Sequence, residues 1–211
     1  MDSTRPGAAA ERSGGEPHER ARADLYALLA RLWQGTPDRE LLRTLQGAAI
    51  GPAEPGGHLA VPWRALVTAM RGTSLDAAAD EYDALFLGVG KPEVFLFGSY
   101  YLAGSLNERP LALLRGDLRE LGLTRDSARG ETEDHVAFLF EVMHTLIVGD
   151  DAVTSSLEQQ RRFFRAHLQP WIDQLCDAVD AHSRAAVWRA VAELTRSFMQ
   201  VEAEGFDLLD V

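Results

Sequence analysis

The sequence contains a single cysteine, Cys176, among 211 residues. One thiol excludes an intramolecular disulfide and argues against a structural zinc site, and both points indicate a reducing compartment. No apolar run approaches the roughly 20 residues that a membrane-spanning helix requires. The first 20 residues also lack the apolar core of a signal peptide. We therefore expect a cytoplasmic protein without stable membrane insertion.

Basic residues are in the minority, because 21 Lys and Arg face 32 Asp and Glu, a net charge of −11. Nucleic-acid binding requires basic clusters that neutralise phosphates, so we predict no nucleic-acid partner. An acidic protein can take a basic partner, although acidity also serves solubility alone. A hydrophobic content of 46% with 25% charged residues is typical of a soluble globular protein.

Helical periodicity dominates from Glu19 onward, whereas residues 1–18 are rich in Gly, Ala, Pro and charge and are predicted to form a disordered tail. Residues 19–211 are predicted to form one all-α domain of about nine or ten helices. Ser74 and Ser183 are expected to cap helices, and Gly88 to end one. The apolar run at 94–97 is the best strand candidate. Because it has no partner strand, we expect an extended loop packed on the core.

Residues 131–147 are the most informative stretch, with a charged start and an apolar body. The spacing predicts a buried helix, with Glu131, Glu133 and Asp134 in its first turn, where the helix dipole favours negative charge. His135 follows Asp134 directly, and a carboxylate beside an imidazole suits a switch, a proton shuttle or an anchoring hydrogen bond. The alternative is that Asp134 caps the backbone and His135 makes one hydrogen bond at the edge of the core.

The other residue patterns in the sequence do not form a complete metal, nucleotide or catalytic site. Glu141 and His144 have the Glu-x-x-His spacing of di-iron bundles, but the other histidines offer no second copy. The segment 88–92 lacks the spacing and the preceding strand of a phosphate loop. Cys176 lies in an apolar-faced helix and is expected to be a core residue. We predict no catalytic site, no metal and no cofactor. A metal-dependent helical-bundle enzyme that uses Glu141 and His144 stays an alternative.

Six aromatic residues lie close together in the sequence with few charges between them. They either form plain core or line a groove for an apolar peptide helix, with acidic residues at its rim for arginines. These residues are Tyr82, Phe86, Phe95, Phe97, Tyr100 and Tyr101.

Four short motifs, in order between about residues 20 and 180, resemble those of one family. Glu131-Thr132-Glu133-Asp134-His135 is similar to a Glu-Pro-x-Asp-His signature. The others are Tyr82-x-x-Leu85-Phe86 with Gly88, Ser99-Tyr100-Tyr101-Leu102, and Gln160-x-x-Phe163-x-x-x-His167-Leu168-x-x-Trp171. Pro110, Leu111, Leu114 and Gly122 match the helix before the signature. The family is the TorD/DmsD/NarJ group of chaperones for molybdenum-containing oxidoreductases.

The resemblance implies an all-helical cytoplasmic chaperone that binds the twin-arginine leader, the apo form, or both, of a molybdopterin oxidoreductase catalytic subunit. Cofactor insertion and assembly before export would follow, and helix exchange would allow a homodimer. By motif, the client-binding residues would be Asp134, His135, Glu131, Glu133, Tyr82, Phe86, Ser99 and Tyr101. The alternative outside this family is a helical adaptor with an unrelated partner.

Two positions depart from the family pattern. Thr132 replaces the usual Pro, and Thr is also a competent helix cap. Leu96-Phe97-Gly98 stands where the family often has Pro-x-Glu, which alters the expected peptide groove. These variants resemble a branch associated with formate dehydrogenases, and the wider resemblance includes DMSO-reductase-type clients.

Overall fold

The structure, a computed structural model, describes residues 17–51, 57–88, 90–124, 130–149, 151 and 155–208. These residues contain ten α-helices and no strand, so the predicted all-α fold is confirmed. The helices are α1 (Pro17–Gln34), α2 (Arg39–Gly47), α3 (Ala60–Arg71), α4 (Leu75–Tyr82), α5 (Gly98–Ala103), α6 (Arg109–Glu120), α7 (Val136–Val148), α8 (Leu157–His167), α9 (Ile172–Asp180) and α10 (Val187–Asp207). A π-helix, η1 (Asp83–Leu87), continues α4.

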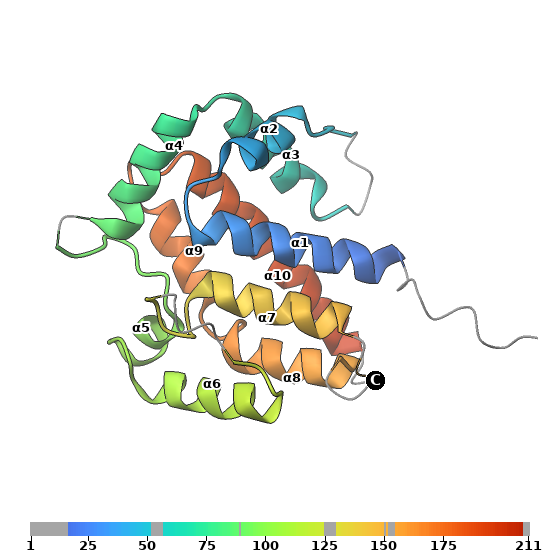
Figure 1. Cartoon of the computed structure of the whole chain (residues 1–211). Helices are drawn as coiled ribbons and strands as arrows, with labels where there is room; N and C mark the ends of the chain where they lie inside the picture. The colour runs from blue at the N-terminus through green and yellow to red at the C-terminus, as the bar shows by residue number, and fades with distance from the viewer. Residues whose placement is uncertain are drawn as a thin grey trace, which may run out of the picture.

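The helices pack around α1 and α7, which lie side by side through the middle of the molecule (Figure 1). Helices α2, α3 and α4 lie on one side of this pair, and α5, α6 and α8 lie on the other. The long helix α10 packs against α9, α3 and α4, so the C-terminal part of the chain closes the core.

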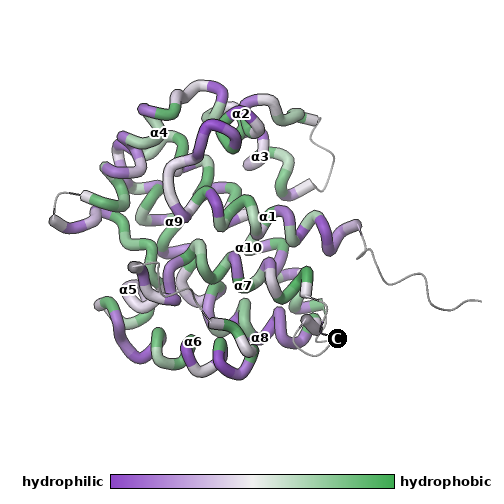
Figure 2. Tube along the Cα trace, in the orientation of Figure 1, coloured by the Kyte–Doolittle hydropathy of each residue, from purple (hydrophilic) through white to green (hydrophobic). Residues whose placement is uncertain are grey.

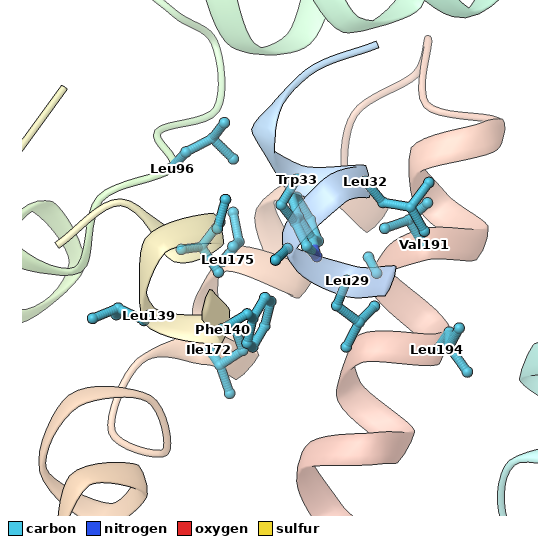
Figure 3. Close-up of a cluster of buried hydrophobic side chains, with 14 of the residues drawn as sticks. Leu29, Leu32, Trp33, Leu96, Leu139, Phe140, Ile172, Leu175, Val191 and Leu194 are labelled. Carbon is cyan, nitrogen blue, oxygen red and sulfur yellow. The ribbon is translucent and has the colours of Figure 1, made fainter. Parts of the chain in front are cut away.

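The core lies where α1, α7, α9 and α10 meet. Coloured by hydropathy, these helices carry both apolar and polar residues (Figure 2). Their buried apolar residues belong to one common core. Helix α7 is apolar on almost every side, which explains its central place. Figure 3 shows buried side chains of all four helices together, among them Leu29 and Trp33 of α1, Phe140 of α7, Leu175 of α9 and Val191 of α10.

Several helix starts follow from local sequence. The side chains of Asp38, Ser74 and Ser156 each accept a hydrogen bond from a backbone N–H in the first turn of α2, α4 and α8. The predicted cap at Ser74 is confirmed. The predicted end at Gly88 is also confirmed, because Gly88 follows η1 directly with a φ of +60°.

The apolar segment at 94–97 is extended and joins no sheet within the described residues. One isolated antiparallel bridge links Phe97 to His135. Leu96 accepts a hydrogen bond from the N–H of Val136, and the N–H of Gly98 donates to the carbonyl of Asp134. Val94 and Leu96 are buried. The segment therefore packs on the core as expected, fastened to the start of α7.

Two helix starts differ from the prediction. Helix α7 begins at Val136, so Glu131, Glu133 and Asp134 precede the helix and do not form its first turn. Helix α10 begins at Val187, and Ser183 does not cap it. In both places contacts from other segments determine the start: residues 96–99 bind the chain before α7, and the carboxylate of Glu81 binds the first turn of α10.

At the N-terminus, α1 begins at Pro17, two residues before the predicted start. The predicted disorder of residues 1–16 lies outside the described residues. None of the helices in the described part of the chain is both long and apolar enough to span a bilayer.

Candidate functional site

A groove of about 490 Å³ lies between α5, α6, the end of α8 and the start of α7. Most of its lining is apolar, and Leu102 and Leu113 are 40% and 57% exposed there. We call this site the groove. Its lining residues are Gly98, Ser99, Leu102, Ala103, Arg109, Pro110, Leu113, Leu114, Asp117, Asp134, Leu139, Ala166, His167 and Trp171.

Close packing at Gly98 places α5 at one end of the groove. A Cβ atom on Gly98 would lie 2.9 Å from Nε1 of Trp171, so only glycine allows the backbone to approach the indole this closely. Trp171 in turn donates its indole N–H to the carbonyl of His167 at 2.7 Å. The Trp171 indole therefore joins the backbone of α5 to the chain between α8 and α9, and this contact fixes one end of the groove.

Asp134 fastens the start of α5 to the chain before α7. It is 3% exposed, and its Oδ2 accepts hydrogen bonds from the backbone N–H and the hydroxyl of Ser99. Its Oδ1 accepts from the hydroxyl of Thr132. Asp134 and Ser99 both line the groove, so the structure brings these two predicted site residues together.

His135 is the N-cap residue of α7, and its Nδ1 accepts a hydrogen bond from the N–H of Ala137. It is 2% exposed, and its ring meets the ring of Phe97 edge to face. This arrangement matches the second sequence alternative, in which His135 makes a hydrogen bond at the edge of the core, except that His135 and not Asp134 caps the helix. His135 lies behind the groove lining and not in it.

Glu131 and Glu133 point to different parts of the fold. Glu131 accepts a hydrogen bond from Gln34 at the end of α1. Glu133 pairs with Arg115 of α6 at 2.8 Å. Neither glutamate lines the groove, and both connect the chain before α7 to neighbouring helices.

Tyr82 and Phe86 belong to the core. Their rings contact each other and Trp188 of α10, and the hydroxyl of Tyr82 donates to the backbone carbonyls of Trp33 and Gln34. Burial raises the pKa of Tyr82 above its usual value. These two predicted site residues lie on the side of α4, away from Ser99 and Asp134.

The remaining aromatic residues lie in α5 or in the segment just before it. Tyr101 stacks on Trp171 of the groove and donates its hydroxyl to the carbonyl of Phe95 at 2.8 Å. Burial raises the pKa of Tyr101. Phe95 stacks on Tyr100. The six aromatic residues therefore divide between the core at Tyr82 and a support for the groove at Tyr101.

The groove carries charged groups that the sequence did not single out. Arg109 begins α6, and Asp117 lies on the same helix two turns further on. Asp117 accepts a hydrogen bond from Nε2 of His167 at 2.7 Å and pairs with Arg162 at 3.3 Å. Burial lowers the pKa of His167, against the opposing effect of Asp117.

A helical pattern could have identified this wall of the groove. Pro110, Leu113, Leu114 and Asp117 are spaced three, four and seven residues apart, which places them on one face of α6. Pro110 and Leu114 were recognised only through the family motif, so Leu113 and Asp117 were not predicted as site residues.

The candidate metal pair is not supported by other ligands. Glu141 and His144 lie on α7, and the described residues contain no group of three or more His, Cys, Asp or Glu side chains that could hold a metal ion. Cys176 is buried, as predicted, and burial raises the pKa of its thiol to about 12.

An all-α domain with an open apolar groove has the features of a helical binding protein. A sequence model of the nitrate reductase delta subunit matches residues 56–177, more than half of the chain. The chain belongs to this family, which includes the TorD-like chaperones, and the resemblance seen in the sequence is confirmed.

The similar proteins are named as chaperones. The chaperone protein TorD of Shewanella loihica is 24% identical over 207 residues, which cover 89% of this chain and 94% of that protein. TorD of Vibrio cholerae serotype O1 is 26% identical over 142 residues, 64% of each chain. TorD of Aliivibrio fischeri is 25% identical over 138 residues, 62% of this chain and 64% of that protein. These names place the chain in a family of chaperones and not of enzymes.

Proposed function

We propose that the protein is a cytoplasmic chaperone for the maturation of a molybdopterin oxidoreductase catalytic subunit. It binds the twin-arginine leader of that subunit, its apo form, or both, and assists cofactor insertion and assembly before export. Formate dehydrogenase and DMSO-reductase types are the client classes that the sequence resemblance favours. The chaperone itself needs no cofactor for this role.

The groove is the observation that carries the proposal. Leu102 and Leu113 are exposed beside it, and burying such side chains under a peptide contributes about 25 cal/mol per Å² of apolar surface. A helix or an extended segment with apolar side chains would fill this space. A leader peptide combines arginines with an apolar stretch, and this combination suits an apolar groove in an acidic protein.

The site residues named from the sequence would serve this groove in different ways. Ser99 and Asp134 line it, and Tyr101 supports it through Trp171. His135 and Glu133 act behind this surface, since they fasten the start of α7 and hold α6. Tyr82, Phe86 and Glu131 connect α4 and the chain before α7 to α1 and α10, so their effect on binding would be indirect.

A tagged pull-down from the native cell tests this function, with captured proteins identified by mass spectrometry. The test variant is Leu113→Gln, which changes an exposed side chain of the groove. The matched control is Leu208→Gln, which changes a 75% exposed leucine at the end of α10. We expect the wild-type protein and the control to capture a molybdopterin oxidoreductase subunit and the Leu113→Gln variant to lose it.

Two other results of the pull-down would contradict part of the proposal. Capture of unrelated proteins alone would replace the chaperone with a helical adaptor. Equal capture by both variants would keep the function and move the binding site away from the groove. Light scattering on the purified protein tests the homodimer by helix exchange, for which we expect a mixture of monomer and dimer.

A further inference from the structure

Asp117 lies where the groove meets a second, much smaller hollow. This hollow has a volume of about 20 Å³, and Asp117 is the residue that lines both spaces. We call it the side pocket. A space of this size holds about one water molecule. Its lining residues are Asp117, Glu120, Leu121, Gln159, Arg162 and Phe163.

Arg162 of α8 bridges two carboxylates of α6 inside the side pocket. Its Nη2 lies 3.3 Å from Oδ1 of Asp117 and 3.2 Å from Oε2 of Glu120. Asp117 and Glu120 are three residues apart, so they share one face of α6. The side chain of Arg162 is 55% exposed, and both contacts come from one nitrogen. Exposed pairs of this kind are weak, so another cation can displace Arg162 at little cost.

His167 holds Asp117 from the other side. Its Nε2 lies 2.7 Å from Oδ2 of Asp117, and its side chain is 8% exposed. A buried neutral imidazole orients the carboxylate by donating a hydrogen bond and leaves its negative charge in place. If Arg162 moves away, Asp117 and Glu120 present two carboxylates at the end of an apolar groove.

We propose that Asp117 and Glu120 form the receptor for an arginine side chain of the bound peptide, and that Arg162 occupies this receptor until the peptide arrives. The inference rests on the proposed function, because it names the part of the groove that reads positive charge. A guanidinium fits because it donates to two carboxylates at once.

The charges along α6 also give the bound peptide a direction. Arg109 lies eight residues before Asp117, which is about 12 Å along the helix. A second cation would be repelled at Arg109 and attracted at Asp117. The basic end of the peptide therefore lies at Asp117, and its apolar part extends past Leu113 toward Arg109.

Fluorescence anisotropy with two synthetic peptides tests the receptor. One peptide carries two adjacent arginines followed by an apolar stretch rich in leucine and alanine. In the other, citrulline replaces both arginines, which removes the charge and keeps the shape. We expect the full-length wild-type protein to bind the arginine peptide more tightly than the citrulline peptide at the same salt concentration.

Single-residue variants then test which side chains cause the preference for the arginine peptide over the citrulline peptide. Asp117→Asn and Glu120→Gln should each weaken binding of the arginine peptide, by about tenfold for Asp117→Asn, and should weaken binding of the citrulline peptide less. Arg162→Gln should tighten binding of the arginine peptide about threefold. Arg165→Gln is the charge-matched control, because Arg165 lies on the same helix but pairs with Asp207. It should have less effect than Arg162→Gln.

The outcomes separate this inference from the proposed function. If the wild-type protein binds both peptides and Asp117→Asn and Glu120→Gln keep the preference for arginine, the receptor is wrong and the groove stands. If Arg162→Gln and Arg165→Gln act equally, the effect is one of net charge, and the role of Arg162 is wrong. If the wild-type protein binds neither peptide, both the receptor and the proposed leader binding fail. Glu120 is 68% exposed, so Glu120→Gln remains informative if Asp117→Asn does not fold.

Discussion

Asp134 joins two parts of the fold through three hydrogen bonds. Its buried carboxylate accepts from the N–H and hydroxyl of Ser99 on α5 and from the hydroxyl of Thr132. A buried donor that loses its acceptor destabilises the fold more than the original bond stabilised it. The acidic residue of the family signature is therefore a structural part of this protein, whatever it contributes to binding.

We expect Asp134→Ala to lower the free energy of unfolding by about 2–4 kcal/mol, because it leaves buried donors without acceptors. Urea denaturation would measure this loss. Asp173→Ala, at a 61% exposed position, is the control and should change stability by less than about 0.5 kcal/mol. A double-mutant cycle with Ser99→Ala should show strong coupling, and additive losses would contradict the direct role of this pair.

Gly88 allows the sharp turn after η1. Its φ is +60°, and a Cβ atom there would lie 2.2 Å from the carbonyl oxygen of Lys91. We expect Gly88→Ala to reduce the free energy of unfolding by about 1–3 kcal/mol, since both the backbone conformation and the contact are unfavourable. Gly116→Ala, inside α6 with open space around the glycine, should instead stabilise by about 0.5–1 kcal/mol. Equal changes in both variants, measured by urea denaturation, would refute this account of Gly88.

At the scale of the helices, α10 begins with a cap from a distant element. Both oxygens of Glu81, on α4, accept hydrogen bonds from the N–H groups of Ala186, Val187 and Trp188. These N–H groups have no partner within the helix, and a negative charge at this end also favours the helix dipole. Glu81 therefore links α4 to α10 and stabilises the first turn of α10.

We expect Glu81→Gln to lower the free energy of unfolding by about 1–2 kcal/mol, because it removes the charge and one acceptor. Ser183→Ala tests the cap that the sequence suggested and should have almost no effect, because Ser183 is exposed and outside the helix. Thermal and urea denaturation of the two variants would distinguish the alternatives. If Ser183→Ala lowered the free energy of unfolding more than Glu81→Gln, the cap of α10 would be Ser183 and not Glu81.

Local signals predicted the helices well, and contacts between distant segments explain the errors. Ser74 caps its own helix, and Gly88 ends one through its own backbone, so the sequence around them was sufficient. The start of α7 depends on residues 96–99, and the start of α10 depends on Glu81. Neither partner lies near the helix in sequence, so periodicity and capping patterns could not locate these boundaries.

At the scale of the whole molecule, the groove is a product of tertiary packing. Family motifs identified Ser99 and Asp134, which lie together in the groove, but they also included Tyr82 and Phe86, which pack in the core. Because Tyr82 and Phe86 lie close to Tyr101 in sequence, one aromatic site was expected, whereas Tyr82 and Phe86 pack against Trp188 and Tyr101 packs against Trp171. Asp117 and His167 come from different helices, so their contact could not be read from spacing.

The burial of His167 also makes global stability depend on pH. Burial lowers the pKa of His167 in the folded protein, while in the unfolded chain it is close to the usual value of about 6.5. The unfolded state therefore binds more protons as the pH falls through about 6.5, and the folded state is destabilised until the folded pKa is also passed. We expect the free energy of unfolding to decrease between about pH 7.5 and pH 5.

The variant His167→Gln, which keeps a neutral hydrogen-bond donor beside Asp117, should show a smaller decrease. His58→Gln, at an exposed position, is the control and should follow the wild-type slope. Urea denaturation across this pH range measures the three slopes. A steeper slope in His167→Gln would mean that the contact with Asp117 outweighs burial and that the folded protein favours the protonated imidazole.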